Sequence, residues 1–250
     1  MNRTLVTILT AFLLVGGTGC ADGASKRSHS KLKPSMSASA DSVVTGEKRG
    51  STEVIRLSEE DYVEVAKRLG IEVATIKAVV EIEAGATHQG FFKAGQPLIN
   101  FDMSMFRKFA RTKGINLAKY NKSHAVVFSR PNVKRYGSTQ AGQQERLRMA
   151  RTIDAATAIQ GCFWGMFQIG GFNWKRCGCE SIEEFVERMS VSEREQLELF
   201  ANFVTNSGML PHLKNRNWSA FARMYNGPSY ASRGYHTRLA NSYRKHGGKK

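Results

Sequence analysis

Apolar residues recur at helical spacing from about residue 55 to the carboxyl end, and this periodicity restricts the chain to a largely helical fold. Capping boxes, in which a serine is followed three positions later by an acidic residue, mark predicted helix starts at Ser58, Ser181 and Ser192. Only residues 97–101 resemble a strand, and weakly. We therefore predict an all-α, or α-dominated, fold in one globular helical domain.

The predicted helices differ in how clearly the sequence marks their ends. One is expected near residues 103–112, a long one over 143–160, and a short one over 217–225, before the turn at 226–228. A last amphipathic helix carries Tyr235, Leu239 and Tyr243. Residues 114–142 are weakly patterned, which predicts a long loop with a turn at 136–138.

The amino terminus predicts export. Arg3 precedes an apolar run over residues 5–15 that is too short to span a bilayer, and small residues then lead to Cys20. This arrangement resembles a bacterial lipoprotein signal, although Gly17 stands where an aliphatic residue is usual. We expect a signal peptide at 1–19, lipidation of Cys20, a disordered tether over 20–52 and a folded domain over 53–250. Ordinary secretion and a retained anchor are the alternatives.

The chain is strongly basic, with a net charge of +16. Such an excess favours an acidic partner, which could be nucleic acid, an anionic membrane or an anionic cell-wall polymer. No helix-turn-helix, zinc finger or RNP motif accompanies the charge, so we expect no nucleic-acid partner. Charge alone does not choose between the other two.

Residues 76–85 read as an apolar helix that ends in two carboxylates and a glycine. Residues three and four apart share a helix face, so Glu83 falls on the apolar side with Val79 and Val80. Glu81 falls beside Lys77, where an ion pair is possible. Burial raises the pKa of a carboxyl group, which is what a general acid needs near neutral pH. The periodicity alone equally allows Glu83 to be a boundary residue that accepts hydrogen bonds.

Three other segments interrupt the helical pattern, at residues 100–102, 164–173 and 225–228. The second alternates aromatic residues, glycines and amides. Glycines permit close approach of a backbone, Trp164 offers a flat face for a sugar ring, and the amides offer paired donors and acceptors. This mixture suits a neutral, hydroxyl-rich ligand, although a tightly packed turn is equally consistent with it.

The histidines, cysteines and serines of the sequence give no support for metal binding or for nucleophilic catalysis. The histidines and cysteines lack metal-ligand spacing, so we expect no metal and no cofactor. No G-x-S-x-G elbow or Cys–His pairing suggests a nucleophile. A disulfide from Cys162 to Cys177 or Cys179 is possible, and free buried thiols are equally so. Glycoside cleavage best matches a partly buried glutamate beside a site suited to sugars.

The chain resembles the N-acetylmuramidase domain found in phage endolysins and some bacterial envelope proteins, a relative of the lysozyme-like superfamily. The resemblance covers about residues 57–243 and rests on four motifs in order. They are Glu-Ile-Glu-Ala at 81–84 with Gly-Phe-Phe at 90–92, Asn-Phe-Asp-Met-Ser at 100–104, Trp-Gly-Met-Phe-Gln-Ile with a later Gly and Asn at 164–173, and Phe-Ala-Arg-Met-Tyr-Asn-Gly-Pro at 221–228.

The resemblance implies a lysozyme-like fold and hydrolysis of the β-1,4 bond between N-acetylmuramic acid and N-acetylglucosamine in peptidoglycan. It places the catalytic acid at Glu83, with Asp102 as a second acid. It also implies substrate-binding positions, for some of which packing is nearly as good an explanation: Trp164, Gln168, Asn173, Tyr225 and Asn226.

The chain departs from the family pattern at several of these positions. Ala84 replaces Ser, Asp102 replaces Glu, Met103 and Ser104 replace Arg-His, Phe163 replaces a small residue and Gly170 replaces Met. These changes leave the second half of the mechanism open. A lytic transglycosylase giving 1,6-anhydro products, and a non-catalytic wall-binding lipoprotein, are therefore the alternatives.

The sequence thus predicts a peptidoglycan hydrolase that acts as a monomer at the cell envelope. Its expected partners are peptidoglycan glycan strands and, through lipidated Cys20, a membrane. The anchored domain is expected to face the periplasm or the cell exterior.

Overall fold

The computed structural model describes residues 53–85, 89–129 and 139–249. The predicted signal peptide, Cys20, the tether and the turn at 136–138 lie outside these residues. Helices dominate the described part, as predicted. They are α1 Glu59–Leu69, α2 Val73–Glu83, α3 Met103–Thr112, α4 Ala125–Phe128, α5 Gln140–Arg151, α6 Ala155–Gln160, α7 Ile182–Met189, α8 Glu193–Asn206, α9 Leu210–Lys214, α10 Trp218–Asn226 and α11 Tyr235–Lys245.

Short strands form two small sheets, whereas the sequence predicted at most one weak strand. Strands β1 Phe91–Lys93 and β2 Gln96–Pro97 form an antiparallel hairpin. A three-stranded antiparallel sheet has the order β3–β4–β5, from β3 Ile99–Phe101, β4 Cys162–Trp164 and β5 Ile169–Gly170. Strands of two or three residues are too short to show an alternating pattern, so the sequence could not reveal them. Three 3₁₀ turns complete the described elements, at η2 Leu117–Tyr120, η3 Gly171–Asn173 and η4 Pro228–Tyr230.

The helix predicted over residues 143–160 is wrong as a single element. The chain leaves the helical path after Arg151, and α6 starts again behind Asp154, whose carboxylate accepts a hydrogen bond from the backbone N–H of Thr157 at 2.8 Å. An aspartate in this position favours a new helix start over continuation, because it satisfies an amide that a helix end leaves free. Likewise, the predicted loop over residues 114–142 contains η2, α4 and the start of α5.

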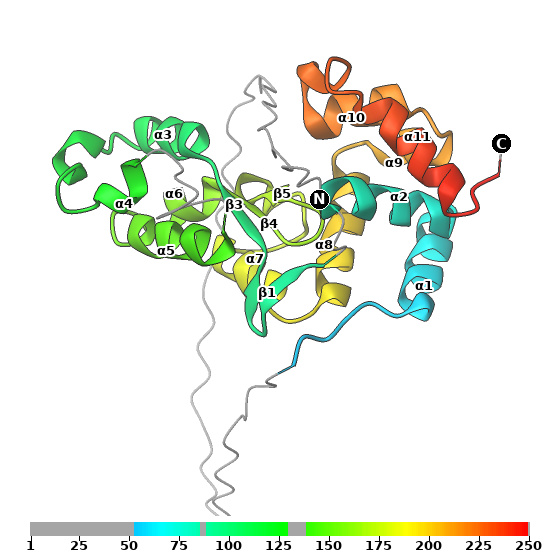
Figure 1. The fold of residues 1–250 in the computed structure, drawn as a ribbon, viewed down its shortest axis with the longest axis horizontal. Helices are drawn as coiled ribbons and strands as arrows, with labels where there is room; N and C mark the ends of the chain where they lie inside the picture. The colour runs from blue at the N-terminus through cyan, green and yellow to red at the C-terminus, as the bar shows by residue number, and fades with distance from the viewer. Residues whose placement is uncertain (1–52, 86–88, 130–138, 250) are drawn as a thin grey trace, which may run out of the picture. The chain divides into compact units, whose positions relative to one another are not determined.

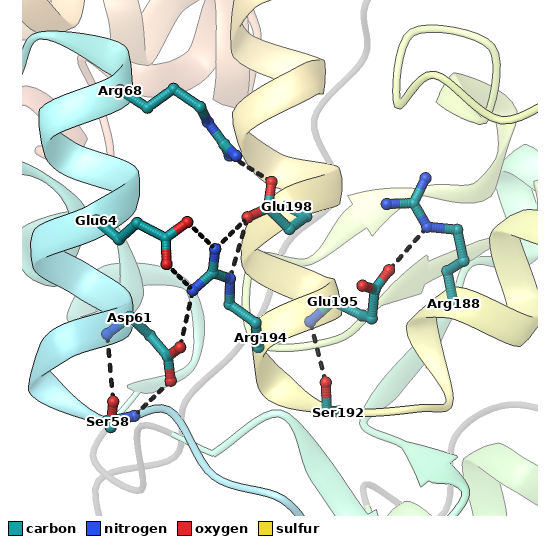
Figure 2. Close-up of polar contacts among 9 residues, drawn as sticks. All are labelled: Ser58, Asp61, Glu64, Arg68, Arg188, Ser192, Arg194, Glu195 and Glu198. Carbon is teal, nitrogen blue, oxygen red and sulfur yellow. Dashed lines mark hydrogen bonds and ion pairs between the residues drawn. The ribbon is translucent and has the colours of Figure 1, made fainter.

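Helix α1 is joined to α8 by an ion-pair network centred on Arg194 (Figure 2). The Arg194 guanidinium lies 2.8 Å from a carboxylate oxygen of each of Asp61, Glu64 and Glu198, and Arg68 pairs with Glu198 from the other side. The capping box at Ser58, with both of its hydrogen bonds formed, starts α1 in the place where Asp61 can reach Arg194. The network therefore joins the first described helix to α8.

A large hydrophobic core runs through the described residues and includes side chains from most of the helices and from β3, β4 and β5, and a smaller cluster packs Ala74 and Ala78 of α2 against Tyr243 of α11. Figure 1 shows α3, α4, α5 and α6 gathered beside β3 and β4, with α2, α9, α10 and α11 packed together elsewhere in the domain. The α2 helix is in extensive contact with α11, which in turn packs on α10. No described helix combines the length and the apolar composition needed to cross a membrane.

Candidate active site

Glu83 ends α2 at the point where α10 and α11 approach it. The predicted apolar face is confirmed, since Ile76, Val79 and Val80 are all 2% exposed or less and Glu83 continues their line as a half-buried side chain. Burial raises the pKa of Glu83 to about 7, although the Asn226 hydrogen bond and the positive charge of Arg238 work in the opposite direction. This carboxyl group is therefore protonated in a large fraction of molecules at neutral pH.

Glu81 has a contrasting environment, two residues earlier on the same helix. Its carboxylate accepts hydrogen bonds from Ser242 at 2.9 Å, Lys245 at 2.7 Å and His246 at 2.8 Å, all on or next to α11. The Lys245 ammonium, helped by Ser242 and His246, lowers the pKa of Glu81 to about 2. Lys77, which the sequence offered as a possible partner, instead pairs with Glu59 at 2.6 Å. Glu81 is thus a permanently ionised anchor for α11.

Asn226 is the residue that orients Glu83. It is the last residue of α10, 7% exposed, and its Nδ2 donates to Glu83 Oε1 at 2.9 Å. Its Oδ1 is buried and accepts no hydrogen bond from any described residue. A side-chain amide can rotate so that either end faces the acid: the NH₂ stabilises a carboxylate, and the oxygen accepts the proton of a carboxylic acid.

Tyr225 holds the 164–173 segment against α10. Its hydroxyl donates to the backbone carbonyl of Phe167 at 2.6 Å, and its ring lies 5.1 Å from that of Phe221. Burial and the nearby negative charge of Glu83 raise the pKa of the Tyr225 phenol well above its usual value. Its hydroxyl therefore remains a neutral donor, and its position supports the packing explanation.

The 164–173 segment forms β4, a turn, β5 and η3. Gly165 has φ = 69°, and a β-carbon there would lie 2.6 Å from Gln196 Oε1, so only glycine fits. Gln168 has φ = 46°, which is unusual for a residue with a side chain. Its Nε2 donates to the Gly165 carbonyl at 2.8 Å, whereas its Oε1 is buried and has no hydrogen-bond partner in the described part of the chain. Asn173 is 8% exposed at the end of η3.

Two polar side chains of α8 fix this segment and the β1–β2 hairpin. Gln196 is fully buried, accepts from the Met166 backbone N–H at 2.8 Å, and donates to the carbonyls of Gly90 at 3.2 Å and Met189 at 2.9 Å. Glu193, 3% exposed, accepts from the Gly90 backbone N–H at 2.9 Å. Buried polar groups of this kind set the position of the 164–173 segment relative to the start of the hairpin.

Trp164 and Asp102 both form hydrogen bonds that stabilise the fold. Trp164 is 2% exposed, and its indole N–H donates to the Ile159 carbonyl at 3.1 Å, so its ring faces are covered and its placement supports packing. Asp102 is 7% exposed and caps α3, accepting from the Met105 backbone N–H at 2.8 Å.

The three cysteines of the described residues, Cys162, Cys177 and Cys179, are free and buried, which agrees with the second of the two alternatives for them. Among the described residues, no group of three or more His, Cys, Asp or Glu side chains lies close enough to hold a metal ion.

The motifs that carry these residues match a known family. The sequence profile of the family described as Muramidase, N-acetylmuramidase, matches residues 72–247. The chain belongs to the N-acetylmuramidase family. It is similar to the crystal structure of the Burkholderia AP3 phage endolysin, with a TM-score of 0.65 and 30% sequence identity over 80% of this chain and 75% of that one. Comparison with curated proteins gives no match.

The family and the solved relative together make this chain a peptidoglycan hydrolase, a glycoside hydrolase of the lysozyme type with a helix-dominated, lysozyme-like fold. Both the predicted enzyme class and the predicted fold are confirmed.

Two residues near the muramidase's Glu83 were not identified from the sequence. Tyr235 opens α11, and burial, with the charge of Glu83, raises the pKa of its phenol. The Arg238 guanidinium lies 5.4 Å from the centre of the Tyr235 ring, and its charge lowers the pKa of Glu83. In the sequence Tyr235 is one member of an amphipathic stripe, and only the packing of α11 on α2 reveals its proximity to Glu83.

Proposed function

We propose that Glu83 is the general acid with which this muramidase cleaves the β-1,4 bond between N-acetylmuramic acid and N-acetylglucosamine. The observation that carries the proposal is the contrast between its two neighbouring glutamates. Glu81 is ionised and bound by three donors, whereas Glu83 is half-buried with a pKa of about 7 and one donor from Asn226. Only Glu83 retains a proton to give at neutral pH.

In the proposed reaction, Glu83 donates its proton to the glycosidic oxygen as the bond from that oxygen to the anomeric carbon breaks. The leaving sugar departs as an alcohol, and positive charge develops at the anomeric carbon and the ring oxygen. Water then adds to the anomeric carbon and gives its proton to the Glu83 carboxylate. The product carries a new reducing end, and the enzyme returns to its protonated form.

The other site residues support this step in different ways. Asn226 can form a hydrogen bond with both protonation states of Glu83, because its amide oxygen accepts from the acid and its amide nitrogen donates to the carboxylate. Gln168 and Asn173 contribute polar groups for the hydroxyl and acetamido groups of the sugars. Tyr225 positions the Phe167 backbone, and Trp164 supports the segment from the core.

Asp102 enters the proposal as a supporting carboxylate. One of its oxygens is committed to the amino end of α3. We therefore assign it first to holding the β3–α3 junction, and its charge only secondarily to stabilising the developing oxocarbenium ion.

Because Asp102 caps α3, the second candidate reaction is one that needs no second carboxylate. With a single free carboxyl group, the 6-hydroxyl of the muramic acid residue could attack in place of water and give a 1,6-anhydro product. Mass spectrometry of muropeptides separates the outcomes, because an anhydro end is lighter than a reducing end by one water. We expect reducing ends from purified sacculi. Anhydro ends would show that the enzyme is a transglycosylase and not a hydrolase. If the protein sediments with sacculi but cleaves nothing, it only binds the wall.

We also propose that the enzyme is a lipoprotein monomer, anchored through Cys20 and tethered by residues 21–52 at the cell envelope. The basic composition supports this location, because peptidoglycan and the membrane surface are both anionic.

Replacing Asn226 with alanine should shift the alkaline limb of the pH–activity profile to higher pH. The Asn226 hydrogen bond lowers the pKa of Glu83, so its loss should raise that pKa by about one unit and keep the acid protonated to higher pH. The maximal rate should fall about tenfold because the carboxyl group loses its orientation. Rates of muropeptide release across pH measure both effects. Asn173→Ala is the control, and we expect it to lower the rate while leaving the limb in place. If the alkaline fall in activity of Asn226→Ala occurs at the same pH as in wild type, Asn226 does not influence the catalytic acid.

A further inference from the structure

A second site lies away from Glu83, between the β1–β2 hairpin and α5. It is a pocket of about 560 Å³ with Phe92, Lys93 and Gln96 on the hairpin side and Arg148 and Arg151 on the helix side. None of these residues belongs to the four motifs that define the active site except Phe92, which ends the first of them.

The walls of the pocket are held in place by hydrogen bonds between side chains of α5 and the backbone of the strands. Gln140 both accepts from the Ile99 N–H and donates to the Ile99 carbonyl, each at 3.0 Å, as a neighbouring strand would. Gln144, itself a lining residue, donates to the Pro97 carbonyl at 2.7 Å. The free edge of β3 is therefore closed by α5, and the pocket is a fixed feature of the fold.

The pocket carries excess positive charge that the described residues do not neutralise. Three cations line it, Lys93, Arg148 and Arg151, against the single carboxylate of Glu145. Arg148 pairs with Glu145 at 2.7 Å, but both side chains are exposed and such pairs exchange readily. Within the described residues no ion pair involves Lys93 or Arg151. An anionic ligand would find two cations available without breaking any bridge.

An apolar surface accompanies the charge. The Phe92 side chain is 44% exposed, which makes it one of few large apolar side chains open to solvent in the described part of the chain. It comes from the hairpin and faces the same pocket as Leu147 of α5. The ligand that fits has carboxylates spaced along a partly apolar backbone.

We propose that this pocket binds the stem peptide of peptidoglycan and so makes the enzyme prefer glycan strands that carry peptides. The stem peptide is attached to muramic acid, has free carboxylates for Lys93 and Arg151, and has alanine methyl groups for Phe92. A bare glycan strand keeps only the lactyl carboxylate beside each muramic acid ring and has neither the peptide carboxylates nor the alanine methyl groups that reach beyond it. The inference rests on the proposed function, because it concerns the same substrate.

The location of the pocket is compatible with one bound strand reaching both sites. Phe91, the first residue of β1, lies eight Cα–Cα steps after Glu83, so their Cα atoms lie within about 28 Å of each other. A stem peptide of five residues extends to about 17 Å and starts from a sugar ring that can itself be displaced from the cleaved bond.

The test compares two substrates: soluble glycan strands with their stem peptides, and the same strands after an amidase has removed the peptides. We expect wild-type kcat/KM to be at least tenfold higher on the peptide-bearing strands. In the double variant Lys93→Glu, Arg151→Glu this preference should disappear, while the rate on stripped strands stays within about twofold of wild type. Both side chains are exposed, so the variant should fold normally.

The control carries the same change in charge outside the pocket. Arg107→Glu, Arg111→Glu alters two exposed cations of α3, and it should keep the preference. Equal wild-type rates on the two substrates, equal losses on both in the pocket variant, or loss of preference in the α3 variant would each overturn the inference. Wild-type enzyme that cleaves neither substrate would instead overturn the proposed function.

Discussion

Glu83→Gln should reduce the rate of muropeptide release by about 1,000-fold while leaving the fold intact. The amide matches the carboxyl group in size and keeps a hydrogen-bond partner for Asn226, but it has no proton to transfer to the glycosidic oxygen. The wild-type rate should also fall above a pH of about 7, where Glu83 ionises. Release from purified sacculi, followed by chromatography between pH 5 and pH 9, measures both effects.

The same substitution should stabilise the protein at alkaline pH. The pKa of Glu83 is raised from 4.5 to about 7, so the folded state binds its proton more tightly than the unfolded state does. The free energy of unfolding therefore decreases between pH 4.5 and 7 and stays lowered above that range. Glutamine removes this cost, and we expect about 2 kcal/mol of added stability at pH 8.5 and little change at pH 4.5, measured by urea unfolding.

Glu81→Gln is the matched control, since it makes the same chemical change two residues away. Its pKa is lowered to about 2, so the ionised Glu81 stabilises the folded state above pH 4.5, and that contribution is lost as the pH falls toward 2. This variant should keep most of its activity and be less stable than wild type at neutral pH. Greater loss of activity in Glu81→Gln than in Glu83→Gln would transfer the acid role to Glu81.

These two glutamates also indicate how far sequence reasoning extends. The apolar face of residues 76–83 is a local property of helical periodicity, and it identified Glu83 without knowledge of any partner. The partners of Glu81 were beyond such reasoning, because Lys245 and His246 lie more than 160 residues later in the chain. The possible partner that periodicity offered, Lys77, lies four residues away and pairs with Glu59 instead.

Parts of the fold that depend on contacts distant in sequence were missed for a related reason. The strands have two or three residues each, and β3 completes its edge with glutamine side chains from α5, a pairing that no periodicity encodes. Helix-capping residues could be predicted where they precede an apolar stripe, as at Ser58. Asp154 was missed because the stripe continues past it and hides the new start of a helix.

Gln196→Leu should lower the free energy of unfolding by about 3 kcal/mol and the melting temperature by about 10 °C. Leucine has a similar volume but leaves two buried backbone groups without their partner, the Met166 N–H and the Met189 carbonyl, while the Gly90 carbonyl keeps only the Leu98 N–H. Met166 belongs to the 164–173 segment, and Gly90 leads into the β1–β2 hairpin, so activity should also fall at temperatures where the variant is still folded. Calorimetry and muropeptide release at 25 °C measure the two losses.

Gln160→Leu provides the comparison, because Gln160 is half-buried at the end of α6 and its side chain makes no hydrogen bond within the described residues. Its stability should change by no more than about 0.5 kcal/mol, with activity unaltered. Equal effects of the two substitutions would mean that any glutamine-to-leucine change is harmful, and Gln196 would then have no special role. A loss confined to Gln196→Leu would show that the site depends on one buried amide of α8 joining the hairpin that follows Glu83 to the strand–turn segment that carries Gln168.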